Sequence, residues 1–399
     1  MKVRNLFVLF LSLVLCCCIL IGCSNTSNSN LDDDSSGGSN NSSSNNTQDE
    51  TNGAESNNDG ETVDLPDNFH IHSFNSSNVC EDCGESYEDN GLIFTKAAND
   101  LFHVTGYVGT ASEVIIPSKF QGLPVAGIGY EAFAYKDVLV RVILPESIIS
   151  ISNNAFTNCE NLTYISIPSN TTRIGNGVFA SCNKLLQKEN GVYYVDKWAV
   201  DCDEIATSVT LRSNTVGIAN SAFYNCNSLT DVILPEGVLS ICSGAFYNCA
   251  KLENINIPDS VIYIDSAVFS GCNALIESEN GVNYVDRWVV GCNMTVDTVT
   301  LRKNTVGIST SALSGASITQ INIPEGVKII DRGAFNGCYN MVGVIIPKTV
   351  KTIGMGAFNN CDNLSTVYYT GSNSQWESIQ IDSTNDSLTS ASMVFNYIQ

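Results

Sequence analysis

Four potential metal ligands lie close together near the start of the chain. His70 and His72 precede Cys80 and Cys83, and this Cys-x-x-Cys pair ends in a glycine. Two imidazoles and two thiolates suit tetrahedral zinc, and four protein ligands would make such a site structural, with no open position for a catalytic water. A Cys80–Cys83 disulfide or two reduced thiols in a loop are equally compatible with the spacing in an exported protein. Structural zinc is therefore one of three interpretations of this small module.

Catalytic chemistry has little other support. The chain has 3 His, and His103 stands apart from the other two in an expected strand. The sequence has no Ser/His/Asp or Cys/His set and no Gly-rich phosphate loop. No motif places two carboxylates together. We therefore expect that the protein is not an enzyme and that it has no cofactor other than the structural zinc considered above.

Charge is concentrated in one segment of the chain. The formal net charge is −22, and residues 24–90 hold 15 acidic side chains with no Lys or Arg. A strongly acidic chain is a poor partner for nucleic acid. Residues 23–65 consist mostly of Ser, Asn, Asp, Gly and Thr, which cannot bury enough apolar surface to fold, so we expect a disordered tether there.

The first residues have the pattern of an export signal. Lys2 and Arg4 precede an apolar run that ends at Gly22-Cys23, which predicts a signal peptide over 1–22. The ending Leu-Ile-Gly-Cys resembles a bacterial lipoprotein lipobox. The resemblance implies that Cys23 is acylated and anchors the protein to the outer face of a bacterial membrane. An uncleaved membrane anchor is the alternative.

The remainder of the chain is one repeat of 23 residues. Seven prolines mark it, and 23-residue gaps recur between them; they are Pro117, Pro145, Pro168, Pro235, Pro258, Pro324 and Pro347. Most copies contain Ala-Phe-x-x-Cys, as at Ala155-Phe156…Cys159. A fixed period of this length predicts a solenoid, because each unit buries its apolar face only against its neighbours.

A longer period of 90 residues is superimposed on the short one. Gly191, Trp198 and Cys202 recur as Gly281, Trp288 and Cys292. In segments 191–200 and 281–290, inward-type and outward-type residues alternate on both sides of a turn-like Asp-Lys or Asp-Arg. This pattern predicts a β-hairpin in each copy. The chain therefore contains two duplicated blocks of about 90 residues, and each block has one long, atypical coil.

The repeat resembles the BspA-like, or Treponema pallidum-type, leucine-rich repeats. We predict a β-rich leucine-rich repeat solenoid of 23-residue coils with two hairpin-bearing long coils and terminal caps. The expected domains are 1–22 signal peptide, 23–65 tether, 66–90 His/Cys module, 91–370 solenoid with its N-terminal cap, and 371–399 C-terminal cap. The resemblance implies a cell-surface protein that adheres to an extracellular or host protein or to another cell. A structural, envelope-organising protein without a dedicated ligand is the alternative, and an enzyme a remote one.

The repeated cysteines are expected to be buried free thiols. They form one column, Cys159, Cys182, Cys226, Cys249, Cys272, Cys338 and Cys361, and a buried free Cys behaves as a small apolar residue. Coils about 4.8 Å apart would also permit some disulfides. Cys202, Cys242 and Cys292 fall outside this column. Leu211-Arg212 and Leu301-Arg302 replace the usual Ile-Pro, and we expect them to weaken single coils.

Binding is expected on the strands that precede each proline. Alternate residues there must face outward and vary while the core stays constant. The candidate binding residues are Glu113, Arg141, Tyr164, Ser166, Asp231, Asn254, Asn256, Gln320, Asn322 and Tyr368. The same alternation places Ile143, Gly343 and Ile345 outward. Trp198 and Trp288 are expected either to mark contacts or to pack the hairpins onto the solenoid.

Overall fold

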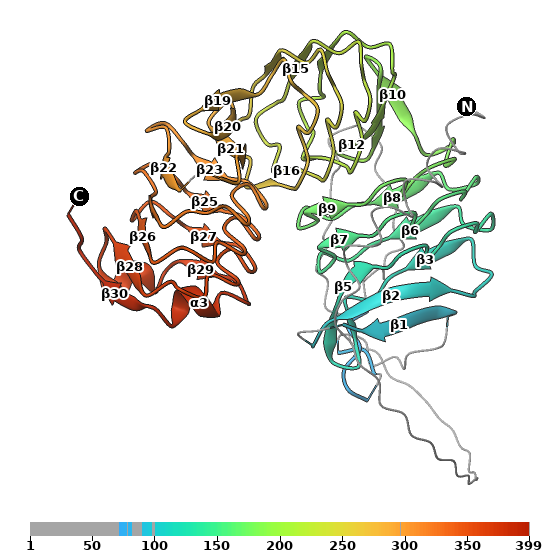
Figure 1. The fold of residues 1–399 in the computed structure, drawn as a ribbon. Helices are drawn as coiled ribbons and strands as arrows, with labels where there is room; N and C mark the ends of the chain where they lie inside the picture. Colours follow the sequence, from blue (N-terminus) through green and yellow to red (C-terminus); the bar gives the residue numbers. More distant parts are fainter. Residues whose placement is uncertain (1–71, 78, 82–89, 98–99, 296, 399) are drawn as a thin grey trace. The chain divides into compact units, whose positions relative to one another are not determined.

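Each repeat forms one coil with two very short strands and three turns. In a typical coil, β6 (Arg141–Ile143) runs to a turn at Pro145, and β7 (Ser150–Ile151) follows. The computed structural model describes residues 72–398, apart from residues 78, 82–89, 98–99 and 296 (Figure 1). The predicted signal peptide and tether lie outside the described residues.

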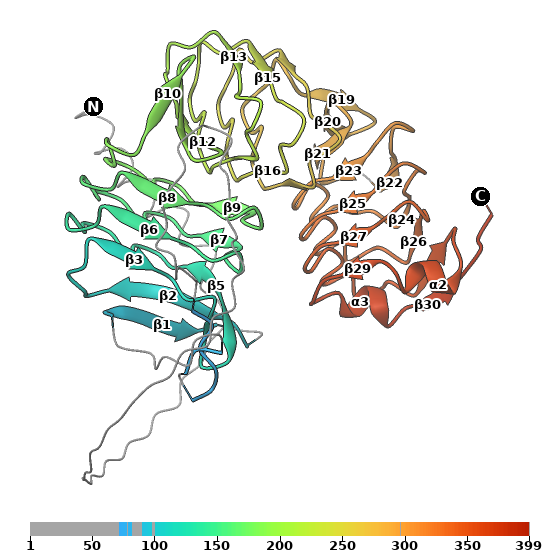
Figure 2. The ribbon, with the colours of Figure 1, turned by 180° about the vertical axis from the view of Figure 1, so that it is seen from behind.

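The strands before the prolines form parallel ladders, which we call together the first ladder (Figures 1 and 2). It has three sections, and the coils of each section form the first, second and third sets. The first set contributes β3 (Glu113–Ile115), β6 and β8 (Tyr164–Ser166). The second contributes β13 (Ser208–Thr210), β15 (Asp231–Ile233) and β17 (Asn254–Ile255). The third contributes β22 (Thr298–Thr300), β24 (Gln320–Asn322), β26 (Gly343–Ile346), β28 (Thr366–Tyr369) and β30 (Ser392–Val394).

The strands after the prolines form a second ladder, which is divided in the same way. Its first section is β2 (Phe102–Tyr107), β5 (Leu123–Ile128), β7 and β9 (Arg173–Ile174). The second is β12 (Trp198–Cys202), β14 (Gly217–Ile218), β16 (Ser240–Ile241) and β18 (Tyr263–Ile264). The third is β21 (Trp288–Cys292), β23 (Gly307–Ile308), β25 (Ile329–Ile330), β27 (Thr352–Ile353) and β29 (Gln380–Ile381). The predicted solenoid is confirmed.

The third side of each coil is a turn built around Ala-Phe. Residues two before and two after the Phe adopt left-handed backbone, as at Asn154 and Asn158 with φ of 58° and 57°. Asn, Gly and Ser dominate these positions because they tolerate this conformation best. The turns also join neighbouring coils, since Phe156 N donates to Val178 O over 3.0 Å.

The core is a set of columns that run from coil to coil. Phe rings stack nearly parallel, with centroids 5.0 Å apart for Phe133–Phe156 and 4.8 Å apart for Phe223–Phe246. A coil alone would expose these rings to water, and stacking removes that area at roughly 25 cal/mol per Å2. The stability of each coil therefore depends on its neighbours.

Two hairpins interrupt the ladders between the sets, and both predicted hairpins are confirmed. The first is β10 (Gln187–Glu189), β11 (Val192–Val195) and β12; the second is β19 (Glu277–Glu279), β20 (Val282–Val285) and β21. The turn residue Asp196 accepts a hydrogen bond from Ile167 N (3.0 Å), and Asp286 accepts one from Ile257 N (3.2 Å). Each hairpin thus ties the end of one set to the start of the next.

Two further residues join the second ladder across these junctions. Cys242, directly after β16, donates its Sγ to Thr172 O (3.7 Å) in the first set. Asp331, directly after β25, is 6% exposed and accepts from the amides of Arg332 (2.7 Å) and Ile264 (3.4 Å). Burial raises the pKa of Asp331 to about 7. An ionisable group therefore lies buried at the second junction.

The first coil carries additional antiparallel strands. β1 (Leu92–Lys96) pairs with β2, and β4 (Lys119–Phe120) pairs with β5. Residues 72–77 and 79–81 pair in antiparallel fashion through Phe74 and Cys80, and their backbone joins the β4 region, with Ser118 N donating to His72 O (2.9 Å). The buried Phe74 anchors this segment to the solenoid.

The last coils are closed by two short helices, α2 (Asn373–Trp376) and α3 (Asp386–Thr389), together with β29 and β30. Asn385 is buried, accepts from Phe358 N (3.0 Å) and donates to Gly354 O (2.9 Å). Its amide group takes the place that a following coil would have, so the final turn keeps its hydrogen bonds.

Candidate binding surface

The outer face of the first ladder begins with a row of interacting side chains in the first set. The Nε of Arg141 lies 3.5 Å from Glu113 Oε1, and its guanidinium carbon lies 4.9 Å from the ring centre of Tyr164. The three residues are in register on β3, β6 and β8. The structure therefore brings these three predicted residues together as a charged and aromatic row.

In the second set the row is polar. Asp231 Oδ1 accepts from Asn254 Nδ2 (2.8 Å) and its Oδ2 from the Thr230 hydroxyl (2.6 Å). These bonds, with that of Thr230 the larger cause, lower the pKa of Asp231, so the carboxylate stays ionised. Beside it Ile233 is 54% exposed. An exposed aliphatic side chain next to a fixed carboxylate is suited to a contact with another molecule.

Two predicted binding residues hold the solenoid itself together. Asn256 accepts from Leu234 N (2.8 Å) and donates to Leu234 O (2.9 Å), in the preceding coil. Ser166 Oγ accepts from Leu144 N (3.1 Å). Each side chain therefore completes backbone hydrogen bonds where the regular ladder ends, a role that sequence alternation alone does not reveal.

In the third set the outward assignment is partly wrong. Gln320 and Asn322 are exposed, as expected, but Gly343 and Ile345 are buried. A Cβ on Gly343 would lie 3.6 Å from the ring of Tyr368, which covers this part of the face and packs on Tyr397 with ring centres 4.8 Å apart. Ile143 in the first set is also buried. Large or closely spaced neighbours on the same face exclude water from these positions.

The replacement of proline by arginine has a structural reason that the sequence did not show. Arg302 N donates to Tyr284 Oη (3.2 Å), and its guanidinium lies 4.2 Å from the centre of that ring. The same guanidinium donates to Glu279 and Glu277, both at 2.7 Å. Arg212 repeats these contacts with Tyr194 and Glu189. Proline lacks the N–H and the charge, so the expectation of weakened coils is wrong: these arginines clamp the hairpins.

The hairpin tryptophans pack onto the solenoid. Trp198 and Trp288 are almost fully buried. A Cβ on Gly217 would lie 2.4 Å from the ring of Trp198, and one on Gly307 would lie 2.3 Å from that of Trp288. Glycine is therefore required beside each indole. Of the two roles expected for these tryptophans, the structure shows packing onto the solenoid.

The seven cysteines of the column all lie within the described residues, and they are buried free thiols, as predicted. Cys159 Sγ donates to Phe133 O (3.0 Å), and five further copies repeat this bond to the preceding coil: Cys182, Cys249, Cys272, Cys338 and Cys361. Burial raises the pKa of Cys338 to about 12 and that of Cys361 to about 11. A hydrogen bond with Cys226, and burial, raise the pKa of Cys202. Cys202, which falls outside the column in the sequence, therefore lies beside Cys226 of the column, while its own Sγ donates to Asp203 O (3.4 Å).

The His/Cys module is only partly within the described residues. His72 packs on Phe74 with ring centres 5.3 Å apart, and Cys80 is buried. His70 and Cys83 lie outside the described residues, as does Cys23. Among the residues that the structure describes, no three His, Cys, Asp or Glu side chains are grouped to hold a metal ion. The zinc interpretation stays a prediction.

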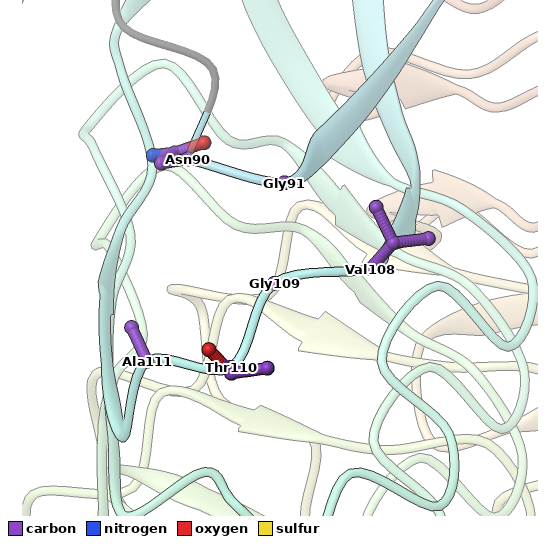
Figure 3. Close-up of a pocket in the computed structure, with 6 residues that line it drawn as sticks. All are labelled: Asn90, Gly91, Val108, Gly109, Thr110 and Ala111. Atoms are coloured by element: carbon purple, nitrogen blue, oxygen red, sulfur yellow. The ribbon is translucent and has the colours of Figure 1, made fainter.

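A hollow at the start of the solenoid offers no catalytic groups. Its volume is about 400 Å3, and it lies between the ends of β1 and β2 (Figure 3). The lining residues are Asn90, Gly91, Val108, Gly109, Thr110 and Ala111, none of which titrates near neutral pH. His103 lies elsewhere, over Gly127, and burial lowers its pKa, so it is neutral at pH 7.

Stacked coils with two short parallel ladders, an apolar column and a broad outer face define a leucine-rich repeat solenoid. Residues 110–190, 201–289 and 290–387 match a model described as "BspA type Leucine rich repeat region (6 copies)". The chain belongs to this BspA-type leucine-rich repeat family, which confirms the resemblance noted in the sequence.

Solved bacterial structures are similar to this chain. A leucine-rich cell surface protein from Faecalibacterium prausnitzii is 26% identical, with 74% of this chain and 98% of that chain covered and a TM-score of 0.30. The T. pallidum leucine-rich repeat protein is 22% identical, with 70% and 91% covered and a TM-score of 0.28. A leucine-rich repeat protein from Bacteroides ovatus is 20% identical, with 78% and 79% covered and a TM-score of 0.26. No curated protein matches the chain.

Within the described part of the chain, no helix has the length and apolar character needed to cross a bilayer.

Proposed function

We propose that this protein is a lipid-anchored, non-enzymatic adhesin that binds an extracellular or host protein, or another cell, through the outer face of the first ladder. The observation that carries the proposal is the contrast between the two sides of each strand. Inward positions repeat the same buried residues, whereas outward positions change from coil to coil and expose polar, aromatic and aliphatic groups.

The second set supports the proposal most directly. Ile233 is exposed beside Asp231 and Asn254, and a mixed patch of this kind buries apolar area while a fixed carboxylate gives specificity. Tyr164 and Arg141 provide the residue types that contribute most to protein interfaces. Both patches lie on the outer face of the first ladder, so an extended partner that bound both of them would contact several coils.

The test is capture of purified extracellular matrix proteins and intact host cells by the immobilised full chain. Tyr164→Ala and Asn254→Ala should each weaken capture at least tenfold. Each should cost no more than about 1 kcal/mol of stability, because the contact that each side chain makes, with Arg141 or with Asp231, lies at the surface. Tyr339→Ala is the matched control, since this tyrosine is 59% exposed and lies outside the first ladder. Capture that survives both variants, or that the control abolishes, would exclude the first ladder as the binding face.

The membrane anchor is tested separately. Acylation at Cys23 should place the protein in the membrane fraction and shift the mass of its N-terminal peptide by the mass of the lipid. Cys23→Ser should release the protein while leaving the solenoid folded. A protein that remains in the membrane fraction after this change would have another anchor.

A further inference from the structure

The turn that joins the first ladder to the second changes its charge along the molecule. The residue that follows each proline, or the arginine that replaces it, lies at the start of this joining turn. In the first and second sets these residues are neutral or acidic, namely Ser118, Glu146, Ser169, Ser213, Glu236 and Asp259. In the third set they are Lys303, Glu325 and Lys348. Lysine therefore begins two of the three joining turns of the third set and none in the other sets.

Two more lysines lie at the end of the same turns. Lys351 N donates to Lys328 O (2.8 Å), so the two residues occupy the same place in adjacent coils. Equivalent positions in neighbouring coils are about 4.8 Å apart, close enough for like charges to destabilise each other. Lys303, Lys328, Lys348 and Lys351, which we call the lysine edge, are all exposed.

The lysine edge is not neutralised by the described parts of the protein. None of its four side chains forms a salt bridge there, whereas Arg212, Arg287 and Arg302 each pair with an acid at 2.7 Å. Glu325 lies between Lys303 and Lys348 in the series and accepts from the Thr370 hydroxyl (2.9 Å). Asp259, whose pKa Lys328 also helps to lower, is bound to Arg287. The three joining turns of the third set thus carry four exposed lysines and one exposed glutamate that forms a salt bridge with none of them, a net charge of +3.

We propose that the lysine edge binds a linear anionic polysaccharide, as a second contact separate from the outer face of the first ladder. The cations follow one edge of one set of coils, so they suit a thin, single chain whose charges repeat along its length. The acidic joining turns at Glu236 and Asp259 in the second set would repel a wide polyanion such as a nucleic acid duplex, which favours a ligand narrow enough to contact the third set alone. Sulfate or carboxylate groups would each supply the anion.

The test measures binding of the full chain to two polysaccharide probes at low ionic strength, where screening is weak. One is a heparin oligosaccharide, which carries sulfates, and the other is an oligogalacturonate, which carries carboxylates only. Lys328→Gln with Lys351→Gln should weaken binding of the preferred probe about tenfold and reduce its salt dependence, because two ionic contacts are lost.

The control is Lys197→Gln with Lys251→Gln, which removes the same charge from exposed lysines away from the edge. This variant should stay within about twofold of the unmodified chain, since the contacts are local. Failure to bind either probe at low salt, or an equal loss in both variants, would overturn the proposal. Equally tight binding of single-stranded DNA through Lys328 and Lys351 would replace the polysaccharide with a nucleic acid.

Discussion

Restoring the repeat consensus at Arg302 should destabilise this protein. Pro occupies the equivalent position in most coils, so Arg302→Pro would ordinarily be a stabilising consensus change. Here it removes the N–H that donates to Tyr284 Oη and the guanidinium that lies on the Tyr284 ring and binds Glu277 and Glu279. The second hairpin would lose its main polar attachment to the following coil.

The expected cost follows from the separate contacts. The two ion pairs involve exposed glutamates and contribute about 0.5 kcal/mol each, and the cation–π contact contributes about 0.5–1 kcal/mol. The hydrogen bond to the tyrosine contributes about 1 kcal/mol. The total loss is roughly 2.5–3 kcal/mol, and we expect the urea midpoint and the Tm to fall accordingly.

A series of variants separates these contributions. Arg302→Ala keeps the N–H, so its difference from Arg302→Pro isolates the hydrogen bond to Tyr284. In a Tyr284→Phe background that difference should largely disappear, since the acceptor is gone. Raising the salt concentration should reduce only the ion-pair part. An Arg302→Pro protein as stable as the unmodified chain would refute the clamp, and Arg212→Pro provides an independent repeat of the measurement.

Further predictions concern burial, glycine and the two ends of the solenoid. The pKa of Asp331 is higher in the folded than in the unfolded chain, so the protein should lose stability as the pH rises from about 4 to 7. Urea titrations at pH 5 and pH 8 should differ by on the order of 3 kcal/mol, and Asp331→Asn should remove this difference. Gly307→Ala should cost about 2 kcal/mol or more by forcing the second hairpin's indole aside, whereas Gly291→Ala, with no contact under 3.5 Å, should be tolerated in thermal melts. Asn385→Ala should lower the Tm by leaving the last turn unpaired, at about 1–3 kcal/mol. Metal analysis of the full chain should find one zinc that Cys80→Ser abolishes if the His/Cys module binds it.

The repeated parts of the fold were accessible from the sequence because each signal occurs many times. Phe156 and Cys159 lie where the 23-residue period places them, and the 90-residue copies fold alike, down to the matching bonds of Asp196 and Asp286. Repetition averages out local exceptions, so period and phase are stronger signals than any single residue.

The exceptions were harder to interpret because their reasons are three-dimensional. Arg302 looked like a lost proline, yet its value depends on Tyr284, which is 18 residues earlier in the chain. Both lie in the 90-residue copies, so the joint recurrence of Arg and Tyr was a usable signal. Ile345 is buried by a neighbour on its own face, which alternation along one strand cannot report.

The matching junctions have a consequence for how such a chain can change length. Asp196 and Asp286, with Arg212 and Arg302, make the same contacts at the two hairpins. Loss or gain of one 90-residue block would therefore join surfaces that already fit each other, without any new interface. A gene built this way can alter the reach of its product, and the display of variable side chains on it, by unequal recombination while both ends stay unchanged.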